Sequence, residues 1–131
     1  MSPSVRRFLY YQFPAILWAV VIFGASSIPE VQLPSIVRHF NDKFLHAVTF
    51  FVFGILIYRA IYPSHSTREF RWKFILLAIL VVVIYGISDE FHQSFVPGRT
   101  PDVNDAAADS LGGLLAAVTI FLLSLRKKPV R

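Results

Sequence analysis

The chain has 131 residues, of which 55% are hydrophobic and only 16% are charged. Because a soluble domain carries roughly 25% charged residues, this composition indicates a membrane protein, and the length allows one domain, residues 1–131. The absence of cysteine excludes disulfides, thiolate metal sites and a cysteine nucleophile. The net charge of +5 is unevenly distributed, so the positions of the charges are more informative than their sum.

Four apolar segments predict an all-α fold with four transmembrane helices in two sequential hairpins, at about residues 8–28, 42–60, 72–95 and 105–125. The first segment covers roughly 30 Å, enough to cross a bilayer. Pro14 lies in its first turns, where a missing N–H costs little.

A cleaved secretory signal is the alternative interpretation of the first segment. Arg6 and Arg7 would be its basic region, and Ala25-Ser26-Ser27 its cleavage site. We favour a retained span, because the apolar run is longer than the roughly 7–15 residues of a signal-peptide core.

The connections contain turn and cap signals. Residues 29–40 read as an extended connection, and Asn41 is a good N-cap for the second helix. Residues 59–73 form a basic loop, and Asn104 or Asp105 can cap the fourth helix. Pro97-Gly98 is the signature of a type II turn.

Basic residues predict the orientation, because cytoplasmic loops are enriched in lysine and arginine. If the N-terminus is cytoplasmic, ten basic residues lie inside: Arg6, Arg7, Arg59, Arg68, Arg71, Lys73, Arg126, Lys127, Lys128 and Arg131. Only Arg38, Lys43 and Arg99 then lie outside, whereas every acid except Glu69 does. We therefore predict a multi-pass protein of the plasma membrane, with both termini cytoplasmic and the functional loops on the extracytoplasmic side.

The outer acids are predicted to lie at or slightly below the head-group boundary. The charge-free runs 44–58, 74–88 and 110–125 each cover only about 23 Å, against roughly 30 Å of hydrocarbon. Lysine and arginine can extend the inner ends by snorkelling, but short aspartates cannot do so at the outer ends. Ionisable groups at that depth usually face a protein interior or a wet cavity.

Helical spacing gives three helices a polar edge at the same membrane level. Asp42 and His46 are four residues apart, as are Asp105 and Asp109, while Asp89 precedes His92 by three residues and Gln93 by four. Ala108, Gly112 and Ala116 add a seam of small residues that allows close helix contact. Expected partners are membrane lipids and an amphiphilic or lipid-linked ligand, with no nucleic acid, and a homodimer is one assembly that we consider.

Three motifs follow one another in the chain: DKFLH at residues 42–46, SDEFHQSFVPGRTPD at residues 88–102, and a D-x-x-x-D-x-x-G-G pattern that begins at Asp105. Together they resemble the VanZ-like family over residues 42–117. The resemblance implies a small polytopic membrane protein linked to low-level resistance to teicoplanin, a lipid-bearing glycopeptide. Phe50 stands where this family often has tyrosine, and Asp109 where it often has asparagine, which adds a negative charge here.

Each feature also has a purely structural explanation. Asp42 and Asp105 suit the first turns of helices, Arg99 can neutralise neighbouring acids, and a histidine such as His46 on an apolar face is usually a satisfied interior residue. These explanations account poorly for the convergence of so many polar groups at one depth. We therefore expect a ligand-binding pocket formed by Asp42, Lys43, His46, Asp89, Glu90, His92, Gln93, Arg99, Asp102, Asp105 and Asp109.

Two functional hypotheses compete, and we favour binding over catalysis. In the first, Arg99 and Lys43 hold the phosphate or carboxylate of an amphiphile in the outer leaflet. In the second, a divalent metal ion activates water against a lipid phosphate, with metal-ligand candidates His46, Asp89, His92 and Asp105 and catalytic candidates Glu90, His92 and Asp89. No zincin, nucleophile-elbow or P-loop motif is present, and a small transporter or a structural membrane protein is a further alternative.

Overall fold

The protein is built from helices in a computed structural model that describes residues 1–29, 32, 42–62 and 71–126. Four helices are long and apolar enough to cross a membrane: Pro3–Ser26, Asp42–Ile61, Arg71–Gln93 and Val103–Leu125. The described residues contain no strand, so the predicted all-α class is confirmed. The predicted cap Asn41, most of the extended connection and residues 63–70 of the basic loop lie outside these residues.

The first long helix has three parts, α1 (Pro3–Arg7), a π-helical turn (Phe8–Gln12) and α2 (Phe13–Ser26). It begins earlier than predicted, because Ser2 caps α1 and Pro3 occupies its first turn. Pro14 therefore lies inside the helix rather than in its first turns. Proline cannot donate to the carbonyl four residues before it, and the wider π-helical turn, in which Phe13 N–H reaches Phe8 O, absorbs that defect.

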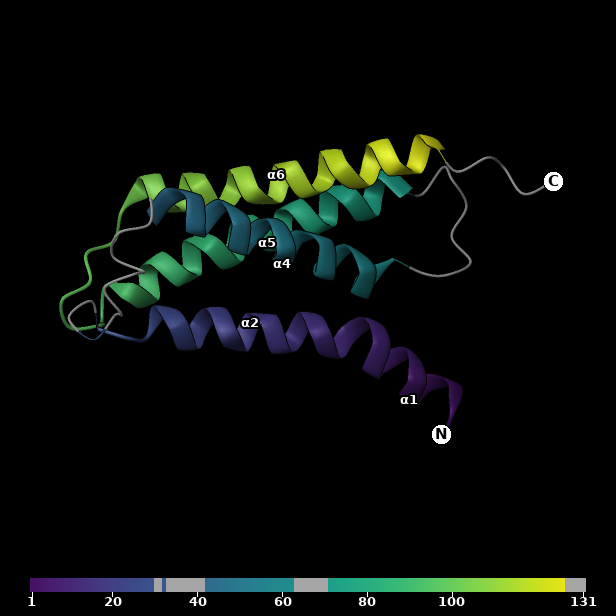
Figure 1. Ribbon diagram of the computed structural model, residues 1–131, viewed down its shortest axis with the longest axis horizontal. Coiled ribbons are helices and arrows are strands. Elements are labelled where there is room, and N and C mark those ends of the chain that lie inside the picture. The colour runs from purple at the N-terminus through teal and green to yellow at the C-terminus, as the bar shows by residue number, and fades with distance from the viewer. Residues whose placement is uncertain (30–31, 33–41, 63–70, 127–131) are drawn as a thin grey trace.

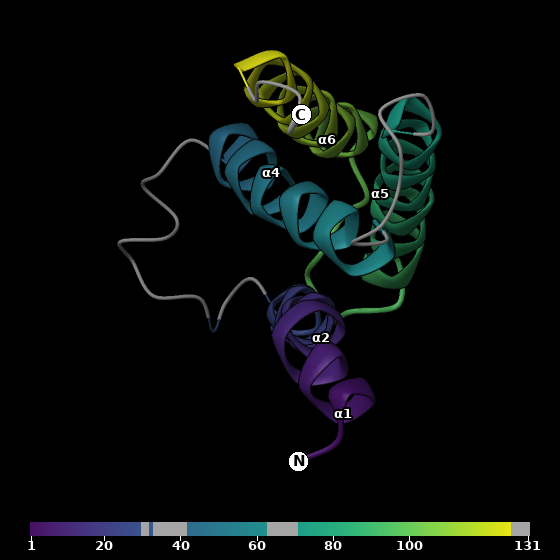
Figure 2. The same ribbon diagram turned by 90° about the vertical axis from the view of Figure 1, so that its right-hand side faces the viewer.

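The remaining helices are α4 (Asp42–Ile61), α5 (Arg71–Gln93) and α6 (Val103–Arg126). These three form one group, and α2 lies against its α4 and α5 side, away from α6 (Figure 2). The ends of α2 and α5 and the beginnings of α4 and α6 meet at one end of the bundle (Figure 1). Large apolar side chains such as Leu76, Leu80 and Ile84 of α5 are exposed on its outer surface, as expected of a protein that faces lipid.

The closest helix contact is between α4 and α6, and it depends on the predicted seam of small residues. Ala108 and Ala116 are buried, and a methyl group at Gly112 would lie 2.8 Å from Phe51 N and closer still to Ala47 O. Only glycine therefore allows the two backbones to approach this closely. The seam is occupied within one chain, by α4.

We expect Gly112→Ala to lower the melting temperature of the purified protein in detergent, because the added methyl group must push α4 and α6 apart. The free energy of unfolding should fall by about 1–3 kcal/mol or more. Gly24→Ala is the matched control, since a methyl group at Gly24 meets nothing within 4 Å. That control should be neutral or slightly stabilising, because alanine favours helix. Equal melting temperatures for the two variants would contradict the close contact.

The loop between α5 and α6 contains the predicted turn. Arg99 N–H donates to Val96 O at 3.1 Å, and Gly98 has φ of 79°, which are the hydrogen bond and the backbone angle of a type II turn. The fourth helix begins before the predicted caps, because the Asp102 carboxylate accepts from Asn104 N at 2.9 Å and so caps α6 itself. The loop thus fixes Arg99 and Asp102 relative to the helix ends.

Candidate functional site

Four buried carboxyl groups lie at the end of the bundle where α2 and α5 finish. Asp89 and Glu90 belong to the last turns of α5, and Asp105 and Asp109 to the first turns of α6. Asp109 is fully buried, with 0% of its surface exposed. The predicted convergence of these acids is therefore present, and they face the interior of the protein rather than its lipid-facing surface.

A cavity of about 290 Å³ opens beside these carboxyl groups, between α2 and the first turns of α4. Five of the predicted site residues line it: Asp42, His46, Asp89, Gln93 and Arg99. Apolar side chains from α2 and α4, including Ile22, Leu45 and Phe50, form the rest of the wall. The cavity therefore places polar groups and lipid-like surface next to each other.

Lys43 lies beside the cavity and joins α4 to the beginning of α6. Its ammonium group donates to Asp102 Oδ2 at 2.6 Å and to Asp105 Oδ1. The hydrogen bond from Lys43, together with the Asn104 N–H, holds the pKa of Asp102 below its ordinary value. Since two carboxylates already neutralise Lys43, its charge contributes less to anion binding than the sequence alone suggests.

His46 and Asp109 form a hydrogen-bonded pair across α4 and α6. His46 Nδ1 donates to Asp109 Oδ1 at 2.9 Å, and His46 Nε2 lies 3.9 Å from Asp42 Oδ1 at the mouth of the cavity. The second oxygen, Asp109 Oδ2, is enclosed and has no hydrogen-bond partner among the residues that the structure describes. Buried polar atoms normally have partners, so this oxygen is an unused ligand position.

Gly86 makes room for the Asp109 side chain. A methyl group at Gly86 would lie 2.9 Å from Asp109 Cβ and 3.0 Å from Asp109 Oδ2. The α5 backbone therefore covers this carboxylate and shields it from lipid. Gly86 was not predicted as a site residue, because a lone glycine in an apolar run carries no signal of what it packs against.

Asp89 and Glu90 are held by hydrogen bonds from three segments. Ser26 Oγ of α2 donates to Asp89 Oδ1 at 2.6 Å, and the backbone N–H of Asp102 donates to Glu90 Oε2 at 2.9 Å. Gln93 Nε2 donates to both carboxylates, at 3.2 Å and 3.3 Å. Gln93 thus orients the two acids, and Ser26, considered in the sequence only as part of a cleavage site, belongs to this network.

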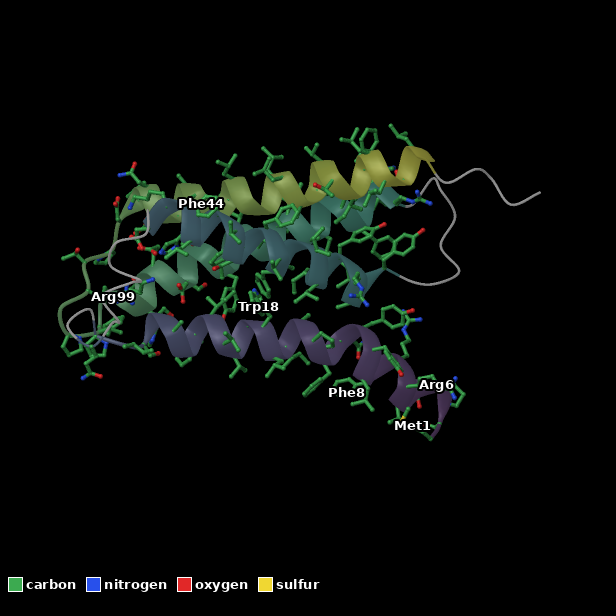
Figure 3. The ribbon with its side chains drawn as sticks, in the orientation of Figure 1. Met1, Arg6, Phe8, Trp18, Phe44 and Arg99 are labelled. Carbon is green, nitrogen blue, oxygen red and sulfur yellow. The ribbon has the colours of Figure 1, made fainter. Side chains whose placement is uncertain are left out.

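Arg99 lies at the same end of the molecule, far from Arg6 (Figure 3). Its Nε donates to the Ile28 carbonyl oxygen at 3.1 Å, and its side chain lines the cavity. No carboxylate pairs with Arg99 in the part of the chain that the structure describes. One hydrogen bond to a neutral carbonyl leaves the guanidinium charge uncompensated by those residues.

His92 stands apart from the other predicted site residues. Its ring stacks on Phe23 with centroids 4.3 Å apart, and its Nε2 is hydrogen-bonded to Ser27 Oγ at 2.9 Å. His92 does not line the cavity. Its geometry indicates that it fixes the end of α2 against α5, and a role for it in ligand binding stays a prediction.

Two groups of His46 and carboxyl groups have suitable geometry for a metal ion within the described residues. One is Asp42, His46 and Asp105, and the other is His46, Glu90 and Asp109; in each, the ligand atoms lie within 4.8 Å of one another. His46 and Asp105 were predicted as metal ligands. Asp89 and His92 were predicted too but belong to neither group, whereas Asp42 and Asp109 were not proposed as metal ligands from the sequence.

These features define a multi-pass α-helical membrane protein that buries a cluster of carboxyl groups at one end of its bundle. The chain belongs to the VanZ/LLP1 family, whose model matches residues 8–124. This match confirms the resemblance found in the sequence and extends it over the first helix. No curated protein and no solved structure matches the chain.

Proposed function

We propose that the protein binds the phosphate-bearing head group of an amphiphilic, lipid-linked envelope component in the cavity at its carboxyl-rich end. Arg99 carries this proposal. Its guanidinium group lines the cavity, donates only to a neutral carbonyl among the described residues, and has the geometry that suits a phosphate. The family link to teicoplanin resistance fits an amphiphilic ligand, because that glycopeptide also carries a lipid chain.

A second cavity, of about 430 Å³, offers space for the apolar part of such a ligand. It lies farther along the same side of α2, and its walls include Ile16 of α2, Phe53 and Ile57 of α4, and Val81 of α5. Trp18 Nε1 of α2 donates to Thr49 O at 3.1 Å, and Thr49 lines the first cavity. A polar cavity followed by an apolar one along a single helix suits a head group with an attached hydrocarbon chain.

The cavity lined by His46, Asp89 and Arg99 is the head-group cavity of this proposal. A divalent cation beside it would complete its charge balance. The group of His46, Glu90 and Asp109 is the better candidate of the two, because its carboxylates are buried and no described residue is a hydrogen-bond partner of Asp109 Oδ2. In the other group, Lys43 already neutralises Asp105. Two carboxylates and one imidazole suit Mn²⁺ or Zn²⁺ better than Mg²⁺, and a cation held there would attract the same phosphate that Arg99 binds.

The test is the binding of farnesyl phosphate to the purified protein, followed by tryptophan fluorescence. The chain has two tryptophans, so the Trp72→Phe variant leaves Trp18, which contacts Thr49 in the wall of the first cavity, as the reporter. Farnesyl phosphate should bind at least about tenfold more tightly than farnesol or inorganic phosphate, because only it offers both parts of the ligand. Equal affinity for farnesol would overturn head-group recognition.

Hydrolysis or transfer of a lipid phosphate is the second candidate function, and the cluster of His46, Glu90 and Asp109 favours it. A divalent cation supplies Lewis-acid activation of a phosphoryl group. Arg99 would hold the phosphate, and Gln93 would keep Glu90 oriented toward the cluster. Turnover of farnesyl diphosphate with Mg²⁺, Mn²⁺ or Zn²⁺ tests this function. A protein that binds this substrate without turning it over with any of the three ions would be a binding protein only.

The carboxyl-rich end is expected on the extracytoplasmic side, and cysteine labelling tests this orientation. Because the chain has no cysteine, Thr100→Cys and Ser66→Cys each introduce one reactive thiol. A membrane-impermeant maleimide added to intact cells should label position 100 at once and position 66 only after the membrane is opened. The reverse pattern would place the cavity on the cytoplasmic side.

A further inference from the structure

The end of the molecule opposite the carboxyl groups contains another cavity, of about 280 Å³. It is lined by Pro3, Arg6, Arg7, Tyr10, Tyr11 and Arg59. Figure 3 shows Arg6 at the far end of the first helix from Arg99. None of these residues belongs to the head-group cavity, so the basic cavity is a separate feature of the fold.

Local structure brings the three arginines together. Arg6 and Arg7 end α1, and the π-helical turn that follows carries Tyr10 and Tyr11. That turn packs against α4, where the Arg59 guanidinium lies 5.8 Å from the centre of the Tyr11 ring. A cation–π contact of this kind restrains an arginine without neutralising it.

The three guanidinium groups have no carboxylate partner in residues 1–29, 32, 42–62 and 71–126. Arg71 at the same end also lacks a carboxylate partner among those residues, but its Nη1 donates to the Ser124 carbonyl and it does not line the cavity. Three like charges around one small cavity repel each other unless an anion lies between them. Arginine recognises phosphate bidentately, and tyrosine hydroxyls can donate to the same oxygens.

The position of the basic cavity along the first helix indicates which kind of phosphate group lies near it. The span Pro3–Ser26 has 24 residues and so covers about 36 Å, which exceeds the roughly 30 Å of a hydrocarbon core. The first turns therefore reach the head-group layer, where tyrosine is enriched. We propose that the cavity formed by Arg6, Arg7, Tyr10, Tyr11 and Arg59 binds the phosphate of an anionic phospholipid in the adjacent leaflet.

Thermal unfolding in a neutral detergent tests the proposal, with dioctanoyl phosphatidylglycerol as the probe. All proteins carry Arg99→Ala, so that the cavity at the other end contributes no arginine and the two proposals are tested separately. Phosphatidylglycerol should raise the melting temperature with an apparent affinity about tenfold above that of dioctanoyl phosphatidylcholine. Arg59→Gln should remove that preference. Arg6→Gln, at an exposed position, should weaken it too, and it serves if Arg59→Gln folds poorly.

Lys73→Gln is the matched control, because it removes one positive charge at the same end but outside the cavity. It should leave the preference for phosphatidylglycerol unchanged. If it weakens binding as much as Arg59→Gln does, the effect is one of general charge and the proposed site is wrong. If inorganic phosphate stabilises the protein as well as the lipid does, the ligand is a soluble anion and the lipid assignment is wrong.

Discussion

The Asp109→Asn variant is expected to be more stable than the wild-type protein without metal, and to gain no stability from Mn²⁺. Asp109 is fully buried and its Oδ2 has no hydrogen-bond partner in the described part of the chain, so those residues satisfy only half of this carboxylate. An amide of the same shape removes that charge and still accepts from His46 Nδ1. The amide Nδ2 takes the position of Oδ2 and also lacks a partner among the described residues, so the gain comes from removing the buried charge alone, and we expect it to be about 1 kcal/mol in the metal-free protein.

Mn²⁺ should reverse the order of stability. A ligand present at about a hundred times its Kd stabilises the folded state by about 2.7 kcal/mol, and only the wild type retains both carboxylates of the site formed by His46, Glu90 and Asp109. The measurement is thermal unfolding of both proteins in the same detergent, with EDTA and with Mn²⁺. Glu90→Gln should also lose the response to Mn²⁺.

The matched control for this experiment is Asp42→Asn. Asp42 belongs only to the other group around His46, and its side chain is 60% exposed. It should therefore keep the stabilisation by Mn²⁺ and show little change without metal. Loss of the Mn²⁺ response in Asp42→Asn, with a full response in Asp109→Asn, would move the cation to the group of Asp42, His46 and Asp105.

Much of the fold could be predicted from the sequence, because membrane spans are determined by simple properties of their residues. Length and hydropathy predicted four helices, and the spacing of Asp42 and His46 and of Asp105 and Asp109 predicted which side chains share a face. The first helix was the exception. Pro14 suggested a helix start, but the π-helical turn at Phe8–Gln12 absorbs the proline and lets the helix begin at Pro3.

The pairing of side chains within the site could not be predicted from spacing. Spacing shows which face of a helix is polar, but not how far each helix rotates about its axis in the bundle. That rotation determines that His46 contacts Asp109, while His92 turns away to stack on Phe23. The contribution of α2 was missed for a different reason. Ser26 and Trp18 lie in an apolar run without a polar stripe, and only the packing shows that they reach Asp89 and Thr49.

Arg99→Ala is expected to weaken the binding of farnesyl phosphate by about 10- to 100-fold, which corresponds to about 1.4–2.8 kcal/mol. A hydrogen bond to a charged group contributes about 1.5–3 kcal/mol, and Arg99 is the arginine that lines the head-group cavity. The affinity for farnesol should not change, because the apolar cavity along α2 remains intact. Trp18 fluorescence in the Trp72→Phe background measures both affinities.

Two further variants separate the geometry of Arg99 from its charge. Arg99→Lys retains the charge but loses the planar donor pair, so it should bind farnesyl phosphate with an affinity between those of the wild type and Arg99→Ala. Lys73→Gln removes one positive charge at the opposite end of the bundle, outside both phosphate-binding cavities, and should bind farnesyl phosphate as the wild type does. Wild-type affinity in Arg99→Ala would show that the head group does not contact this arginine. Because Lys43 is already paired with two carboxylates, the cation site would then be the remaining source of attraction for a phosphate.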